Sequence, residues 1–301
     1  MSHSIEVKRS MWETISKSIS DATGIESVIR GHQSLSGGCT NEAYRVETDD
    51  HVFFIKKHQE VMAPMFQAEF EALKELESTQ TIKVPTPICW GAGEGHTWLV
   101  TSFLDLKACK GDSLFELGRQ LASLHKIQKP YFGWKRDNAI GITKQPNPPS
   151  RDWVSFWRTH RLEWQFKLAR DKGQSFSGAD ALLNDMGRLF DHYDPHPTLI
   201  HGDLWSGNIA ALSDATPVIF DPAGYYGDPE AEFGIIEMFG GFGRSFFQGY
   251  ESVRPQHAGF SRRLPLYRLY HELNHYNLFG PSYTSSCQSS IQQLLDLIQE
   301  T

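Results

Sequence analysis

Short runs of alternating apolar and polar residues dominate the first hundred positions, and this period of two is typical of half-buried strands. Four such runs occupy residues 27–35, 42–48, 51–58 and 97–106. Residues 65–78 instead carry apolar side chains at helical spacing, with Phe66, Phe70, Leu73 and Leu76 on one stripe. The N-terminal stretch also has helical spacing. The first part of the chain therefore predicts a β-rich unit with helical packing.

Helical periodicity takes over after residues 104–107. Residues 113–127 and 153–173 are predicted as long amphipathic helices, and a Pro-rich loop is expected at 143–152 between them. Apolar runs around "LIHGDLWSGNIAAL" and "TPVIFDPA" interrupt the helical pattern before it continues to the C-terminus. The Gly-rich run "FGGFGRSFF" follows a helix, so we interpret it as a helix bend and not as a phosphate loop. The predicted organisation is a β-rich lobe (1–104) and a mainly helical lobe (105–301).

Composition narrows the class of protein. The 301 residues are 40% apolar and 22% charged, as in an ordinary globular protein, and the net charge of −7 argues against nucleic acid or an anionic membrane as partner. No apolar run is long enough to span a bilayer, and the N-terminus does not have the pattern of a signal peptide. The four cysteines are far apart, without a CxxC pair, so we expect a cytoplasmic protein without a disulfide framework.

Three polar residues beside apolar strands suggest phosphoryl transfer. Asp203 and Asn208 are five residues apart in "HGDLWSGN", and Asp221 follows the apolar run "PVIF". Protein kinases use an Asp, an Asn and a second Asp in this order to accept the substrate proton and hold magnesium. Each residue taken singly is more simply a turn or strand-end residue, but the three in this order favour a kinase. His201 is expected to support the loop by hydrogen bonding.

A kinase must also hold the phosphates of ATP. The loop "LSGGCTNEAY" can place backbone N–H groups near an anion at Gly37 and Gly38, although without GxGxxG it also fits a plain hairpin. Strand alternation puts Lys56 and Lys57 on opposite faces and leaves both open as the phosphate-binding lysine. We prefer Lys56 by analogy with the V-A-I-K pattern of kinases.

A helical carboxylate supplies a partner for that lysine. Glu69 falls inside the apolar stripe of its predicted helix, whereas Glu71 faces the opposite side. A carboxylate on an apolar stripe needs a cation nearby, and Lys56 would provide one. The alternative is a Glu at the edge of the stripe that reaches solvent.

These residues, with "GRQLASLH", "YFGWKRDNAIG", "DWVSFWRTHRL" and "DPAGYYGDPEAEF", resemble the fructosamine kinase (ketosamine 3-kinase) family over nearly the whole chain. The resemblance implies an α+β, protein-kinase-like, two-lobed fold related to the aminoglycoside phosphotransferases and choline kinases. It makes Asp203 the catalytic base, Asn208 and Asp221 the Mg²⁺ ligands, and Lys56 with Glu69 the pair that organises ATP. The hinge residues Ser102, Phe103 and Leu104 would contact adenine through their backbone.

Two further roles are implied by the same resemblance. Trp205 would flank the sugar of the substrate, with a core aromatic as the alternative. Some family members carry a cysteine where this chain has Cys39, which implies redox control, with the need for a small residue in this loop as the alternative. The chain would accordingly be a monomer or a redox-linked dimer. Departures at Ser102, Pro229, Phe233 and Gly234 leave catalysis credible and put the substrate preference in doubt.

The implied activity is ATP- and Mg²⁺-dependent phosphorylation of a sugar hydroxyl, at the 3-position, in free or protein-bound ketoamines such as ribulosamines, erythrulosamines or fructosamines. Such a reaction would serve the removal of sugars from amines. The alternatives are an aminoglycoside- or choline-type small-molecule kinase and a nucleotide-binding protein without catalysis. A protein kinase fits least, because no "APE" run follows "DPA".

Overall fold

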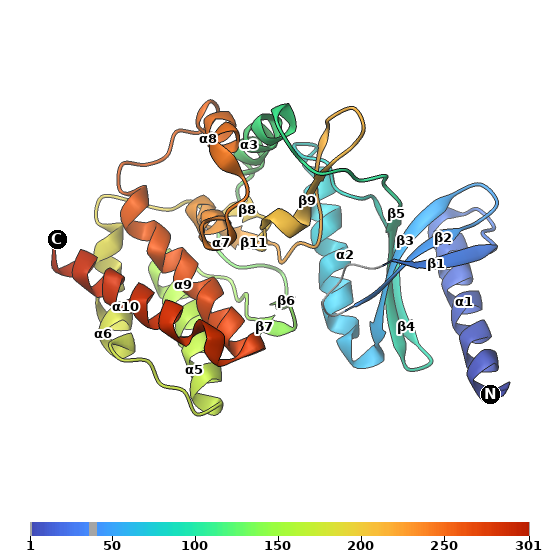
Figure 1. Cartoon of the computed structure of the whole chain (residues 1–301), viewed down its shortest axis with the longest axis horizontal. Coiled ribbons are helices and arrows are strands. Elements are labelled where there is room, and N and C mark those ends of the chain that lie inside the picture. The colour runs from blue at the N-terminus through green and yellow to red at the C-terminus, as the bar shows by residue number, and fades with distance from the viewer. Residues whose placement is uncertain (1, 36–40, 301) are drawn as a thin grey trace.

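The computed structural model describes residues 2–35 and 41–300, and its elements form two lobes (Figure 1). The first lobe is built on a five-stranded antiparallel sheet with the strand order β1-β2-β3-β5-β4. Its strands are β1 (Gly31–Leu35), β2 (Glu42–Glu47), β3 (Val52–Gln59), β4 (Pro87–Gly93) and β5 (His96–Ser102). The β-rich lobe predicted from the alternating pattern is therefore present.

Two helices cover the two faces of this sheet (Figure 1). Helix α1 (Ser2–Thr23) packs Met11, Ile15 and Ile19 against one face, in a cluster that includes Phe53 and Ile55. Helix α2 (Ala63–Ser78) packs against β4 and β5, with Phe66, Leu73 and Leu76 in the main core of the molecule. The faces of β3 thus alternate as expected, and Phe54 and Lys56 line the pocket on the α2 side.

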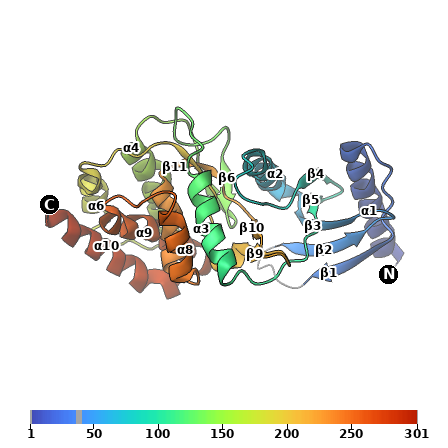
Figure 2. The ribbon, with the colours of Figure 1, turned by 90° about the horizontal axis from the view of Figure 1, so that it is seen from above.

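The second lobe is mainly helical. Its helices are α3 (Asp112–Leu124), α4 (Trp153–Trp157), α5 (Trp164–Asp171), α6 (Ala179–Asp185), α7 (Phe233–Phe239), α8 (Gly243–Glu251), α9 (Phe260–Phe279) and α10 (Thr284–Gln299). Three short antiparallel pairs complete it: β6 (Asn138–Ile140) with β7 (Thr143–Gln145), β8 (Thr198–Ile200) with β11 (Tyr225–Gly227), and β9 (Ile209–Ala211) with β10 (Pro217–Ile219). Figure 2 shows β9 and β10 between the sheet of the first lobe and the helices of the second.

Several boundaries differ from the sequence prediction in the first lobe. The strand expected at 27–35 begins only at Gly31, and the strand β4 was not predicted. The β4 sequence "PICWGAG" starts with proline and contains two glycines, so it lacks the alternation that marks the other strands. The connection from β5 to α3 contains the predicted lobe boundary at 104, which stays a prediction.

The long helix predicted at 153–173 is interrupted. A π-helical segment, Arg158–Glu163, separates α4 from α5, and such segments often occur at functional sites. The Gly-rich run at 239–247 is not a bend within one helix: α7 ends at Phe239 and α8 begins at Gly243. Gly240 and Gly241 between them have φ of 66° and 94°, which ends the first helix.

Within the described residues, no helix is long and apolar enough to cross a membrane. The three cysteines in that part of the chain, Cys89, Cys109 and Cys287, are free thiols, and burial raises the pKa of each. They are therefore protonated at neutral pH, and weak nucleophiles.

Candidate active site between the lobes

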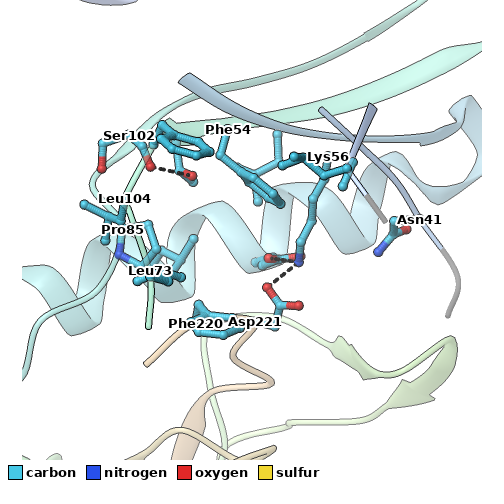
Figure 3. Close-up of a pocket in the computed structure, with 16 residues that line it drawn as sticks. Asn41, Phe54, Lys56, Leu73, Pro85, Ser102, Leu104, Phe220 and Asp221 are labelled. Carbon is cyan, nitrogen blue, oxygen red and sulfur yellow. Dashed lines mark hydrogen bonds and ion pairs between the residues drawn. The ribbon is translucent and has the colours of Figure 1, made fainter. Parts of the chain in front are cut away.

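A pocket of about 320 Å³ lies where the two lobes meet (Figure 3). Its walls are largely apolar at one end and charged at the other. The apolar end includes Leu73, Pro85 and Leu104, and the charged end is formed by Lys56, Glu69 and Asp221 (Figure 3). This division suits a ligand with a flat apolar ring and an anionic tail.

Lys56 is held by two carboxylates from different lobes (Figure 3). Its Nζ lies 2.6 Å from Glu69 Oε1, on α2, and 2.6 Å from Asp221 Oδ1, after β10. Burial by itself would lower the pKa of Lys56, but the charges of Asp221 and Glu69 outweigh burial and raise it. Lys56 is therefore a permanent cation at the charged end of the pocket.

The structure separates the two candidate lysines. Lys57 points to the other face of β3, where its Nζ lies 3.1 Å from Glu42 Oε2 and 6.0 Å from the centre of the Tyr44 ring. Glu69 does not reach solvent at the edge of its stripe: its side chain is 12% exposed and paired with Lys56. Of the two lysines, Lys56 alone lines the pocket.

Asp203 and Asn208 lie in one tight loop between β8 and β9. The Asn208 Nδ2 donates to the main-chain oxygen of Asp203 (2.9 Å) and to its Oδ2 (3.3 Å). Backbone bonds from Trp205 N to Asp203 O (3.1 Å) and from Asn208 N to Trp205 O (2.9 Å) close the loop. The five-residue spacing thus brings the amide of Asn208 back onto Asp203.

His201 ties this loop to the strand that carries Asp221. Its Nδ1 accepts from Asp203 N (3.3 Å), so the proton is on Nε2, which lies 2.9 Å from Phe220 O. Burial lowers the pKa of His201, which keeps the ring neutral. The structural role expected for His201 from the sequence is what these contacts show.

Glu232 supports the same loop and was not identified from the sequence. Its fully buried carboxylate accepts from His201 N (2.6 Å) and from Gly202 N (2.9 Å). The residue follows β11 in a short 3-10 turn, so its role depends on tertiary contacts. The only local signal was its place two residues after Glu230 in "DPEAEF", where three acidic residues alternate.

Asp221 adopts an unusual backbone conformation. Its φ is +59°, a region that costs most L-residues strain but that Asp and Asn tolerate. The two loops of the site are also in close contact, because a Cβ on Gly202 would lie 2.4 Å from Ala223 O. Strained backbone of this kind is common at functional sites.

Negative charge accumulates around Asp203. Burial, followed by the charges of Asp221 and Glu232, raises the pKa of Asp203 well above its usual value. The hydrogen bond from Asn208 and the charge of Lys56 act in the opposite direction. The carboxylate of Asp203 is therefore a stronger base than an exposed one.

The three hinge residues all line the pocket. Ser102 N donates to Thr86 O (2.9 Å) and Phe103 N to Val52 O (3.2 Å), so these two amides are engaged within the sheet. Among the hydrogen bonds of the described residues, none uses the amide of Leu104. Leu104 is therefore the hinge residue whose N–H is available to a ligand.

Trp205 is not a core aromatic. It is 37% exposed, and its ring centre lies 5.5 Å from that of Phe239, itself 42% exposed. Gly207 permits this position, because a Cβ there would lie 2.2 Å from the indole. An exposed aromatic pair thus stands next to Asp203. Gly37, Gly38 and Cys39, the remaining residues predicted for the site, lie outside the described residues.

Comparison with known proteins identifies the family. A model of the fructosamine kinase family matches residues 11–297. The chain belongs to the fructosamine kinase family. It is 43% identical over 285 residues to a probable ketoamine kinase from Synechocystis, covering 94% of this chain and 97% of the relative. It is also 43% identical over 274 residues to a chloroplastic protein-ribulosamine 3-kinase from Arabidopsis thaliana, covering 88% and 83%.

Solved structures agree with this assignment. A putative fructosamine-3-kinase from Haemophilus somnus superposes with a TM-score of 0.87 at 28% identity, covering 94% of this chain and 97% of the other. An ADP-bound aminoglycoside phosphotransferase shares the fold at 11% identity, with a TM-score of 0.62 over 97% of this chain and 98% of the other. The predicted two-lobed, protein-kinase-like α+β fold is confirmed, and the chain is a phosphotransferase that acts on a hydroxyl group.

Proposed function

We propose that this kinase transfers the γ-phosphoryl group of ATP to a sugar hydroxyl of ketoamines, the adducts of sugars with amines. The observation that carries the proposal is the juxtaposition of Lys56, Glu69 and Asp221 with the loop of Asp203 in a chain of this family. The relatives named above are a probable ketoamine kinase and a protein-ribulosamine 3-kinase. The second name supports the 3-hydroxyl as the acceptor and a protein-bound ketoamine as substrate.

The pocket offers complementary groups to the adenine and to the phosphates of ATP. The apolar end would enclose the adenine ring, with the Leu104 amide as hydrogen-bond donor. Lys56, fixed by Glu69, would bind the phosphates as a point charge. The cationic end and the apolar end lie in one pocket, so a single nucleotide can use both.

The acidic groups of the site fit a magnesium ion. Asp221 has its Oδ1 on Lys56, and its side chain is 43% exposed within the pocket. The Nδ2 of Asn208 is engaged with Asp203, which turns the amide oxygen of Asn208 away from that contact. Among the described residues, no group of three or more His, Cys, Asp or Glu could hold a metal. Asp221 and Asn208 would offer one carboxylate and one amide oxygen, and Mg²⁺ usually binds one or two carboxylates and completes its shell with phosphate oxygens and water.

In the proposed transfer step, Asp203 accepts the proton of the acceptor hydroxyl. As the acceptor hydroxyl oxygen forms its bond to the γ-phosphorus, the bond from phosphorus to the β,γ-bridging oxygen breaks, and ADP leaves. The hydroxyl proton passes to the Asp203 carboxylate, whose raised pKa suits it to accept that proton. Bound Mg²⁺ supplies neutralisation of phosphate charge. Trp205, exposed beside this loop, would flank the sugar.

The test is a substrate panel. We expect ATP consumption with ribulosyl, erythrulosyl or fructosyl amines, and a product whose phosphate is on the 3-hydroxyl by NMR. Aminoglycosides and choline are the rival acceptors, and ATP without acceptor is the blank. Turnover with choline or an aminoglycoside, and none with any ketoamine, would replace the proposal with the rival function.

A further inference from the structure

Lys56, Glu69 and Asp221 come from three different elements, β3, α2 and the segment after β10. Glu69 is on α2 and Asp221 follows β10, so each anion depends on a different element for its position. In protein kinases the corresponding Lys–Glu pair must be in place for activity, and movement of the helix that carries the Glu controls it. The contacts that hold α2 in place are therefore relevant to catalysis in this protein.

The face of α2 away from the pocket carries two more carboxylates, Glu71 and Glu75, one helical turn apart. Trp134 Nε1 donates to Glu75 Oε2 (2.7 Å), and Tyr226 OH donates to Glu75 Oε1 (2.8 Å). Both aromatic side chains are 3% exposed, and both belong to the second lobe. A partly buried carboxylate on α2, with its side chain 21% exposed, is thus anchored across the lobe boundary by two buried, neutral donors.

Ion pairs add a weaker tie at the same place. Lys135 and Arg136 lie 2.9 and 3.0 Å from the Glu71 carboxylate, and Lys129 lies 4.0 Å from Glu75. The side chains of Lys135 and Lys129 are about half exposed, and exposed pairs contribute little. The hydrogen bonds to Glu75 are therefore the stronger connection, since both donors are buried and hydrogen bonds to a carboxylate are among the stronger ones in proteins.

The same stretch of chain reaches the segment that follows Asp221. Asn138 Nδ2 donates to Gly224 O (2.9 Å), and Gln145 Nε2 donates to Ala223 O (3.1 Å). Gly133 and Tyr226 exchange two backbone hydrogen bonds of 2.9 Å. Residues 131–147, which we call the brace, therefore contact both the helix of Glu69 and the loop of Asp221.

A buried polar network keeps the brace rigid. Asn138 Oδ1 accepts from Gln145 Nε2 and from Asn147 Nδ2, both at 2.8 Å. Arg161, in the π-helical segment, donates to Asn147 Oδ1 (2.7 Å), and Tyr270 OH donates to Gln145 Oε1 (2.7 Å). All of these side chains are buried, so breaking any bond would leave an unpaired polar group in the core.

We propose that the brace fixes Glu69 and Asp221 in their places on Lys56, and that Trp134 and Tyr226 are positioning residues that act through Glu75. The site is then assembled before nucleotide binds, without a separate step that moves α2. This inference rests on the proposed function for its link to catalysis, whereas its effect on nucleotide binding can be measured without any acceptor. The motif "YFGWKRDNAIG" (131–141) lies in the brace and contains none of the proposed catalytic residues, so the inference assigns a function to this motif.

The test removes the two donors and keeps an aromatic ring at each position, although the ring at position 134 becomes smaller. Trp134→Phe, Tyr226→Phe and the double variant are compared with wild type at a temperature where each is folded. We expect the α2 amides (63–78) to exchange about 10-fold faster in the double variant, and the Kd for ATP with Mg²⁺ to rise about 5- to 10-fold. Each single variant should show a smaller change of the same kind. The KM for ATP should rise more than the KM for the ketoamine.

Glu77→Gln is the matched control. Glu77 is on the same helix, and the described contacts give its side chain no hydrogen bond or ion pair, so this variant should behave as wild type. Unchanged α2 exchange and ATP affinity in the folded variants would overturn the inference. Faster exchange that is uniform over the molecule, with ATP affinity unchanged, would show a general structural role and would also overturn it. Failure of the proposed function would appear separately, as a wild type that binds ATP but phosphorylates no ketoamine.

Discussion

Acidic side chains outnumber cations at the centre of the site. Asp203, Asp221 and Glu69 act on one another and on Lys56, and Glu232 adds a further negative charge behind the loop. Burial is the largest cause of the raised pKa of Asp203, and the charges of Asp221 and Glu232 raise it further. Neutralisation of charge beside Asp221 would favour the ionised Asp203 that can accept a proton. The electrostatics of these residues therefore make a cation part of the proposed chemistry.

The role of Asp203 can be tested by replacing one of its carboxylate oxygens with an amide nitrogen. Asp203→Asn keeps the shape of the side chain and removes its ability to accept the proton, so turnover should fall by about 10²-fold or more. The Kd for ATP should change little, because Asp203 is not among the residues that line the nucleotide pocket. Steady-state kinetics and calorimetry measure both quantities, with Asp214→Asn on an exposed turn as control. Near-normal turnover in the folded variant would remove the assignment.

Asp221 should couple nucleotide binding to magnesium. Asp221→Asn tolerates the positive φ and removes the negative charge, so Mg²⁺ should strengthen ATP binding at least about 10-fold less than in wild type. The measurement is a titration of ATP at several Mg²⁺ concentrations, with circular dichroism to verify the fold. An unaltered dependence of ATP affinity on Mg²⁺ would contradict the assignment.

Residues with a local pattern could be predicted, and residues defined by distant contacts could not. The five-residue spacing of Asp203 and Asn208 and the helical stripe around Glu69 are properties of short segments, and the structure shows Asn208 bonded to Asp203 and Glu69 paired with Lys56. Alternation separated Lys56 from Lys57 but could not say which face met α2. Glu232 and Glu75 act on residues about 30 and 151 positions away, which no local pattern reveals.

At the scale of elements, α3 and α8 illustrate how sequence motifs serve packing. Gly118 in "GRQLASLH" lies so close to α8 that an added Cβ would be 2.1 Å from Phe246 O, and Gly249 of α8 lies as close to Phe115 O (2.0 Å). The two helices therefore touch backbone to backbone. His125, just after α3, hydrogen-bonds Tyr250 of α8 (2.8 Å) and lies 3.7 Å from Glu232. The crossing thus supports the residue that holds the catalytic loop.

Gly118→Ala should separate these helices. The added methyl group meets rigid backbone, so the free energy of unfolding should fall by about 1–3 kcal/mol despite the better helix propensity of alanine. Gly187→Ala is the matched control, because a Cβ there would meet Val154 at an ordinary 3.7 Å. Denaturant unfolding measures both variants. Equal stability of the two would show that the helix crossing adapts at no cost.

The predicted elements agree with the structure where one hydrophobic periodicity runs through the whole element. They differ where the backbone is irregular. The strands β2, β3 and β5 and the helices α2 and α3 carry uninterrupted patterns. The hairpin β6–β7 overlaps a Pro-rich stretch, and the π-helical segment sits inside an amphipathic pattern that continues through it. Its cause is tertiary, since it delivers Arg161 to Asn147 and to the face of the Tyr225 ring, 4.2 Å from its centre.

The proposed chemistry lies where the lobes meet, and polar contacts join the lobes there beside an apolar core that both lobes share. Lys56 with Asp221 and Glu75 with Tyr226 each join an element of the first lobe to one of the second. The two-lobed class was predictable, because a change from period two to helical period is visible over long stretches of sequence. The contacts across the boundary were not, since they depend on how the lobes pack.

Buried histidine should make the stability of the molecule depend on pH. His271 is 3% exposed on α9, its Nδ1 has no hydrogen-bond partner within the described residues, and burial lowers its pKa to about 3, helped by His275 and Arg161. The unfolded chain, with an ordinary histidine pKa of about 6.5, binds the proton more readily than the folded one. The stabilising contribution is therefore complete above pH ~6.5 and is lost as the pH falls from there toward 3, by at most about 1.4 kcal/mol per pH unit.

His271→Phe should flatten this part of the dependence, whereas His51→Asn, at an exposed position, should leave it as in wild type. Denaturant unfolding between pH 4 and 7 measures the slope, and a His271→Phe profile parallel to wild type would show that other groups cause the acid sensitivity.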